Sequence, residues 1–163
     1  MADEFNMKIV FAGDEQLNKN LGLQIKRIKD LRPAWKDMSS TLNLFQQRVF
    51  KSRGAGDGLP KWQKLAASTI AAKGHDRPLI LTGKLRGAMT RNKAAGALRL
   101  FTKKEFRWGV DDAEVPYAKW HQTGTKRLPV RKPLRLTTKM RKDLVKIMQR
   151  HIIYKEEFKR VTR

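Results

Sequence analysis

The sequence predicts an α+β fold in which a small antiparallel sheet packs with several helices, including long helices toward both ends. Apolar residues recur at helical spacing in the first third of the chain and again in its last part. Between them, two short runs of alternating apolar and polar residues flank a polar turn, a pattern typical of a hairpin. The 163 residues suit one domain, 1–163, with a strand and helical part at 1–55, an α+β core at 61–136 and a C-terminal helix at 137–163.

The N-terminal part is expected to hold a short strand and two helices. Met7–Ala12 is apolar and partly β-branched, which predicts a strand. The next helix starts at Asp14, the expected N-cap, and is amphipathic because its apolar residues are spaced by four, four and three: Leu17, Leu21, Ile25 and Ile28. A second helix begins at Pro33, and its apolar residues have heptad spacing: Trp35, Met38, Leu42, Phe45 and Val49. We expect this face to pack on its own domain, and a subunit interface is the alternative.

The rest of the chain predicts four helices and a hairpin. The expected helices are 62–73, ended by Gly74, then 84–89 with Thr82 as its N-cap, 116–124, and 137–159. The inward face of the last helix, 137–159, is expected to comprise Met140, Leu144, Ile147, Met148 and Ile152. The expected strands are 97–102 and 106–110, and alternation in the second strand predicts one buried face and one solvated face.

The charge is extreme: 37 Lys and Arg against 15 Asp and Glu give a net charge of +22. Such a chain attracts polyanions, including nucleic acid, anionic lipid and acidic protein surfaces. The window from Val115 to Lys142 contains no acidic residue. Its basic residues predict a solvated surface or a partner site: Lys119, Lys126, Arg127, Arg131, Lys132, Arg135, Lys139, Arg141 and Lys142.

Several classes of protein are not favoured by this composition. There is no Cys, which excludes a disulfide framework and a thiolate metal site. The first residues are acidic and lack an apolar core, so we expect no signal peptide. No apolar run approaches the roughly 20 residues that a membrane span needs. We expect no cofactor, no metal and no membrane partner.

Catalytic patterns are weak. Asp111, Asp112 and Glu114 precede His121, a set that suggests acid–base or metal chemistry, but we favour a solvated loop that pairs with nearby basic residues. The glycines of 52–60 lack the Lys and hydroxyl of a phosphate loop. We expect His121 to be structural, with a ring nitrogen bonded to backbone or to Gln122, and a pH switch is the alternative. The chain is therefore expected not to be an enzyme.

Nucleic-acid binding is the main alternative function. Basic and aromatic residues alternate in the expected hairpin, as in surfaces that track a strand and stack bases: Arg99, Phe101, Lys103, Lys104, Phe106, Arg107 and Trp108. However, Phe106 and Trp108 share one strand face with Val110, which predicts that they are core residues.

Four short motifs occur in a fixed order between residues 62 and 134. They are Trp62-x-x-Leu65, Leu81-Thr82-Gly83-Lys84-Leu85-Arg86, Tyr117-Ala118-x-x-His121-Gln122-x-Gly124-Thr125 and Arg131-Lys132-Pro133-Leu134. In this order they resemble the virion-morphogenesis proteins (tail-completion, neck) of tailed bacteriophages. The chain departs from the family pattern at Ala88, Lys132 and Leu134.

The resemblance implies a non-catalytic subunit of a homo-oligomeric ring, expected to be a hexamer, that joins head and tail. Its expected partners are further copies of itself, other neck, connector and tail proteins, and DNA in the lumen. Its expected location is the head–tail junction of the virion, and the host cytoplasm during assembly. The motif residues are expected to serve folding and packing, and Gly124 to supply a backbone conformation that other residues resist.

Overall fold

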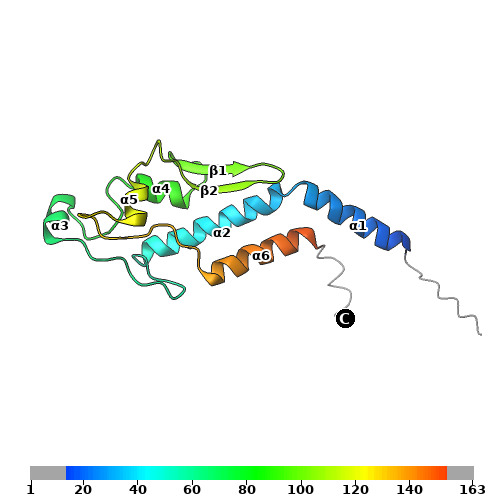
Figure 1. Ribbon diagram of the computed structural model, residues 1–163, viewed down its shortest axis with the longest axis horizontal. Helices are drawn as coiled ribbons and strands as arrows, with labels where there is room; N and C mark the ends of the chain where they lie inside the picture. The colour runs from blue at the N-terminus through cyan, green and yellow to red at the C-terminus, as the bar shows by residue number, and fades with distance from the viewer. Residues whose placement is uncertain (1–13, 154–163) are drawn as a thin grey trace, which may run out of the picture.

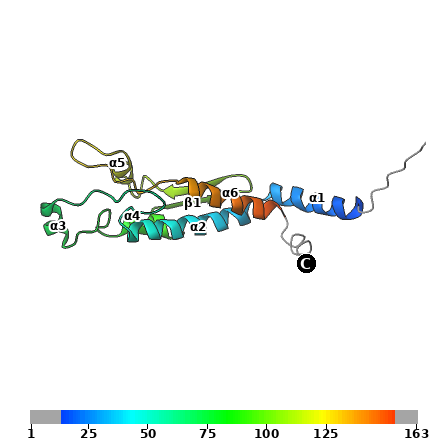
Figure 2. The same cartoon turned by 90° about the horizontal axis from the view of Figure 1, so that it is seen from below.

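The computed structural model describes residues 14–153, which form six helices and one two-stranded antiparallel sheet. This confirms the α+β class. The described part is elongated: α2 runs through its centre, the hairpin and α6 lie along α2, and α1 extends beyond them (Figures 1 and 2). The strand expected at Met7–Ala12 lies outside the described residues, as does the expected helix beyond residue 153. Within 14–153, no helix combines the length and apolarity needed to cross a bilayer.

Two consecutive helices, α1 (Asp14–Lys29) and α2 (Arg32–Lys51), form the long axis of the molecule. Both were expected, and Pro33 occupies the first turn of α2, where its missing N–H costs no helical hydrogen bond. The whole heptad face of α2 is at most 9% exposed: Trp35, Met38, Leu42, Phe45 and Val49. This face therefore packs within its own domain, as expected, and not at a subunit interface.

The hairpin covers one side of α2. Strands β1 (Ala97–Phe101) and β2 (Phe106–Val110) pair antiparallel, as expected. Phe106 stacks on Trp35 with ring centroids 5.5 Å apart, and Trp108 packs against the main core. The interpretation of these two hairpin aromatics as core residues is thus confirmed.

Helix α3 (Ala67–Lys73) is shorter than expected, because 62–66 is not helical. A helix starting at Trp62 would use the carbonyls of Gln63 and Lys64 for its own i+4 hydrogen bonds. These two carbonyls instead accept hydrogen bonds from the Arg131 side chain, at 2.8 and 3.0 Å. Because Arg131 is distant from this segment in the sequence, local periodicity predicted the wrong start for α3.

Two short helices follow, α4 (Lys84–Thr90) and α5 (Ala118–Thr123). The N-cap of α4 is Gly83, in a left-handed conformation, and not Thr82 as expected. The Thr82 hydroxyl only accepts a long 3.4 Å bond from the Lys84 amide. Helix α5 starts two residues later than expected.

Helix α6 (Thr138–Ile152) packs against α2, and its Ile147 shares a small core with Trp35, against which Phe106 of the hairpin also packs. Thr137 caps it, since its Oγ1 accepts a hydrogen bond from the Met140 amide at 3.1 Å. Met140 and Ile147 are buried, and the other residues of the expected inward face within the helix are partly buried: Leu144, Met148 and Ile152.

Candidate functional site

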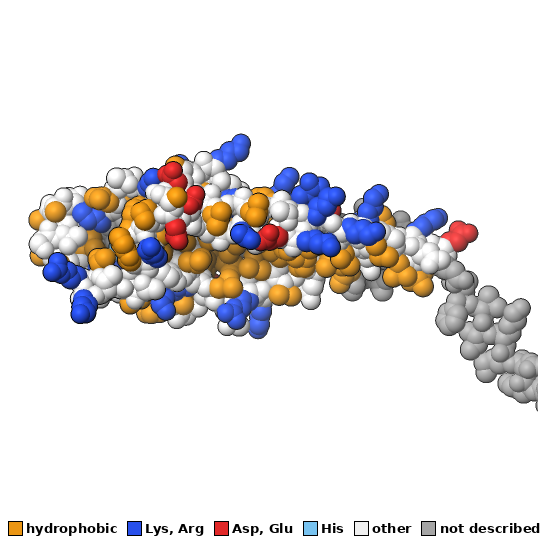
Figure 3. Space-filling view, turned by 45° about the horizontal axis from the view of Figure 1, so that its top comes forward, with side chains coloured by type: hydrophobic (Ala, Val, Ile, Leu, Met, Phe, Trp, Pro, Cys, Tyr) orange, Lys and Arg blue, Asp and Glu red, His pale blue; other side chains and the backbone are white. Residues whose placement is uncertain are grey.

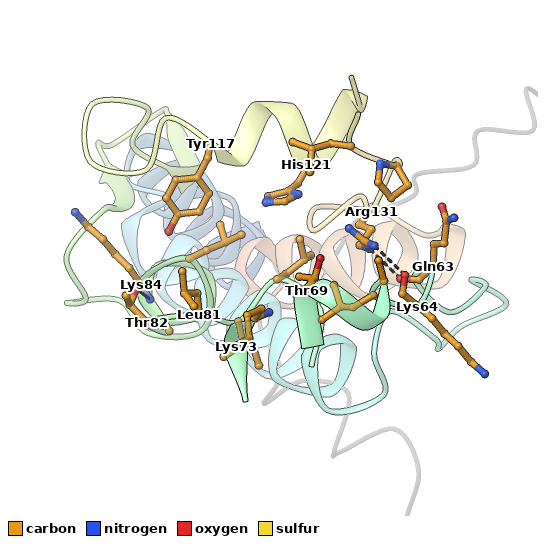
Figure 4. Close-up of a pocket in the computed structure, with 18 of the residues that line it drawn as sticks. Gln63, Lys64, Thr69, Lys73, Leu81, Thr82, Lys84, Tyr117, His121 and Arg131 are labelled. Carbon is orange, nitrogen blue, oxygen red and sulfur yellow. Dashed lines mark hydrogen bonds between the residues drawn. The ribbon is translucent and has the colours of Figure 1, made fainter. Parts of the chain in front are cut away.

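The residues of the four motifs gather around one pocket of about 670 Å³ near α3 and α5 (Figure 4). Its walls come from 63–66, α3, the loop 79–83, the start of α4, α5 and the loop 127–131. Each of the four motifs contributes lining residues: Leu65 from the first, Thr82, Gly83 and Leu85 from the second, Tyr117 and His121 from the third, and Arg131 from the fourth.

A cross-link between the first and fourth motifs builds one end of the pocket. The Trp62 indole Nε1 donates to the Lys132 carbonyl at 3.0 Å. In the opposite direction, Arg131 donates from Nε to the Gln63 carbonyl and from Nη2 to the Lys64 carbonyl. Trp62 is 4% exposed and Arg131 is 6% exposed, so these bonds are well shielded from water. The two segments are thereby fixed to each other.

The third motif is fixed to the fourth in a similar way. The Arg131 amide donates to the His121 carbonyl at 3.0 Å. The Gln122 side chain pairs with both backbone groups of Leu134, donating to its carbonyl at 2.8 Å and accepting from its amide at 3.2 Å. Gly124 has φ of +78°, which confirms the expected need for glycine there. The fourth motif therefore bridges the first and the third.

His121 does not have the partner that we expected. Its Nδ1 is buried without a hydrogen-bond partner among the described residues, and Gln122 is occupied by Leu134. The ring lies edge-on to Tyr117, with centroids 6.2 Å apart. The ring faces the pocket, toward Arg131 (Figure 4). The expected hydrogen bond to backbone or Gln122 is therefore wrong, because Gln122 pairs with Leu134 and the His121 ring lines the pocket.

Three motif residues have other roles. Leu85 is 2% exposed and belongs to the main core, and Pro133 is buried. Arg86 is exposed and lines a second hollow, which shares Ile80 and Gly83 with the first pocket.

The basic residues of the acid-free window do not form one continuous solvated face. Arg131 is buried, Arg135 is partly buried and donates to the Pro60 carbonyl at 3.3 Å, and Lys139 lies 3.5 Å from Asp57. Arg131 and Arg135 serve internal contacts, which corrects the expectation for them. The other seven are exposed: Lys119, Lys126, Arg127, Lys132, Lys139, Arg141 and Lys142.

The hairpin is a poor platform for stacking bases. Arg99 lies over the Trp108 ring, 4.4 Å from its centroid, and donates to the Ala88 and Gly109 carbonyls. Burial lowers the pKa of Arg99 to about 10. The Arg99 guanidinium and the Trp108 ring are therefore used in contacts within the fold.

The carboxylates before α5 lie in an exposed loop, as expected. Glu114 pairs with Lys84 at 2.8 Å, and Asp111 accepts a hydrogen bond from the Ala113 amide at 3.0 Å. Within residues 14–153, no three side chains of the metal-binding types come close enough to hold an ion.

The pocket is electropositive. Its lining includes five cationic side chains and, among the described residues, no carboxylate: Lys64, Lys73, Lys84, Arg127 and Arg131. Burial, followed by the charge of Arg131, lowers the pKa of Lys73, and burial lowers the pKa of Arg131 itself. Burial first, and then the charges of Arg131 and Lys73, lowers the pKa of His121. His121 is therefore disposed to remain neutral near pH 7.

This depressed pKa predicts a pH dependence of stability. Tyr117, Lys73 and Arg131 face the ring, and none supplies a negative charge near neutral pH. Because the unfolded chain takes up the His121 proton more readily, the free energy of unfolding should rise as pH rises from below the folded pKa toward the unfolded pKa of about 6.5. This contribution is fully present above the unfolded pKa of about 6.5 and is lost as pH falls through the folded pKa. Urea unfolding at several pH values should show a flatter profile for His121→Gln.

The matched control is His75→Gln, which removes a histidine outside this pocket. It should leave unchanged the rise in the free energy of unfolding with pH that His121 causes. Equal pH slopes for the wild-type chain and His121→Gln would contradict the argument.

Sequence reasoning missed the second hollow, of about 820 Å³. None of its described lining residues is acidic, and its cations come from α2, the loops on both sides of α3, and α4: Lys51, Arg53, Arg77, Arg86 and Arg91. Arg53 is already paired with Asp76 at 2.6 Å. No local sequence pattern joins these residues, because the fold brings them together from separate segments.

No protein-family model, no curated protein and no solved structure matches this chain.

Proposed function

We propose that this protein is a structural component of a tailed-phage virion that completes the tail or joins it to the head. The observation that supports this proposal most is the mutual cross-linking of the first, third and fourth motifs. Trp62 binds the fourth motif, Arg131 binds the first, and Gln122 binds the end of the fourth. Motif residues that hold a fold together suit an assembly scaffold better than a reaction centre.

The proposal includes a homo-oligomeric ring, and α1 supplies a surface suited to it. This helix extends beyond the rest of the domain, and its apolar residues form a stripe (Figures 1 and 3). Within the described residues this stripe is 45–59% exposed at each position: Leu17, Leu21, Ile25 and Ile28. A helix of 16 residues is only marginally stable in water without packing, so we expect the stripe to pack against a partner. A second copy of this chain is the occupant that we propose, and a head-to-tail contact between copies gives a ring when its rotation closes.

The double variant Leu21→Asp and Ile28→Asp should therefore weaken self-association. Burying one such side chain contributes about 1.5–3 kcal/mol, so losing two should lower the association constant at least about 100-fold. Size-exclusion chromatography with light scattering should detect smaller species, while thermal melts should show that the subunit still folds. The control Asn18→Asp and Lys19→Asp, at exposed polar positions of α1, should retain the assembly. Assembly by the apolar variant to the wild-type extent would rule out this surface.

The function itself is tested by adding the full chain to purified tails or connectors of the phage that encodes it. We expect co-migration with tails or connectors in size-exclusion chromatography. A persistent monomer that ignores tails but holds DNA tightly would overturn the proposal.

Sequence-nonspecific nucleic-acid binding is the second candidate, and the basic second hollow favours it. If about six basic side chains contacted phosphates, affinity should fall about 10³-fold between about 50 and 200 mM salt. DNA binding that shows this loss of affinity with salt, without association with tails, would favour this candidate.

A further inference from the structure

The electropositive pocket described above carries charges that its own described residues do not neutralise. Arg131 is 6% exposed, and both of its hydrogen bonds go to neutral carbonyls. Lys73 is only partly buried, and its ammonium donates to another neutral group, the Arg77 carbonyl, at 2.9 Å. Buried charges are normally paired with an opposite charge, because burial removes their hydration. The site therefore has an electrostatic preference for an incoming anion.

His121 adds a directional group to this preference. Its Nδ1 is buried and unpartnered among the described residues, and the ring lines the same pocket as Lys73 and Arg131. These three side chains come from α5, α3 and the loop 127–131, and they converge on one space (Figure 4). A carboxylate there would accept a hydrogen bond from the ring and would offset the charge of the two cations.

The remaining walls are mostly apolar. They include aliphatic side chains from four segments: Leu65, Ala66, Leu79, Ile80, Leu81, Leu85 and Leu128. Leu81 is 73% exposed, so the rim also offers an apolar contact. A pocket of this kind, apolar with a few convergent polar groups, is typical of sites that enclose a ligand.

We propose that this pocket binds an acidic side chain, Asp or Glu, carried between apolar residues on a segment of a partner protein. A peptide fits the observations better than DNA does. Duplex phosphates lie on the outside of a convex rod and present no apolar group, whereas this site is concave and largely apolar. The inference rests on the proposed function only in taking the partner to be a neighbouring virion protein.

The test is a selection of random peptides displayed on beads against the full-length chain at about 0.15 M salt, where surface charges are screened beyond about 8 Å. Enriched peptides should carry Asp or Glu beside Leu, Ile, Val or Phe. Fluorescence polarisation of one enriched peptide should then show at least about tenfold weaker binding after its acidic residue is replaced by the amide.

Two variants locate the site. Lys73→Gln removes a pocket cation, and Thr69→Trp fills the pocket from α3. Each should weaken the peptide at least about tenfold, and thermal melts should show that both fold. Lys93→Gln removes an exposed lysine outside the pocket and should bind like the wild-type chain.

Three results would overturn the inference. They are enrichment of no peptide, enrichment without acidic residues, or equal binding by Lys73→Gln and Thr69→Trp. A short DNA duplex that binds the wild-type chain, and loses affinity with these same two variants, would assign the pocket to nucleic acid instead. Self-association of the pocket variants, measured by light scattering, should be unchanged. Failure of the pocket inference is thus distinguishable from failure of ring assembly.

Discussion

Trp62→Ala is expected to lower the free energy of unfolding by about 3–5 kcal/mol, the cost typical of a buried tryptophan. Trp62 is 4% exposed and packs edge-on against Phe50, with ring centroids 5.3 Å apart. Its loss also leaves the Lys132 carbonyl without the indole donor. Urea unfolding followed by circular dichroism measures the change.

The matched control is Trp120→Ala. Trp120 is 46% exposed, so its removal creates no enclosed cavity and should cost well under half as much. Similar losses for the two variants would show that Trp62 does not secure the junction of the first and fourth motifs.

The second large effect is expected for Gly124→Ala, which should destabilise the chain by about 2–5 kcal/mol. Gly124 has φ of +78°, a conformation that L-residues resist. An added Cβ would lie 2.7 Å from Val130 Cγ2 and 3.2 Å from the Leu128 carbonyl oxygen, so the turn would have to shift. Chemical unfolding of the purified variant tests this expectation.

Gly22→Ala is the control for the glycine effect. Gly22 lies inside α1, and an added Cβ there would meet no heavy atom within 4 Å. The substitution should leave stability unchanged or raise it by about 0.5–1 kcal/mol, because alanine favours the helix. A Gly124→Ala variant as stable as Gly22→Ala would mean that the turn adapts without cost.

The sequence alone correctly predicted structural features that depend on residues close to one another along the chain. The heptad face of α2 is buried as its spacing predicts, because residues three and four apart share a helix face. The hairpin pairs as alternation predicts, and Gly74 ends α3 in a left-handed conformation as its position predicts. Each of these features depends on local periodicity or on local backbone conformation.

Only the tertiary structure decided where α3 begins and what the motifs build. Arg131 is 68 positions from Gln63, and its hydrogen bond to that carbonyl prevents the first turn of the expected helix. The same contact buries a cation that the sequence placed on a solvated face. It also helps to form a pocket whose lining comes from segments between residues 63 and 131. Contacts over such distances leave no periodic signal in a single sequence, because they depend on how elements pack and not on how residues are spaced.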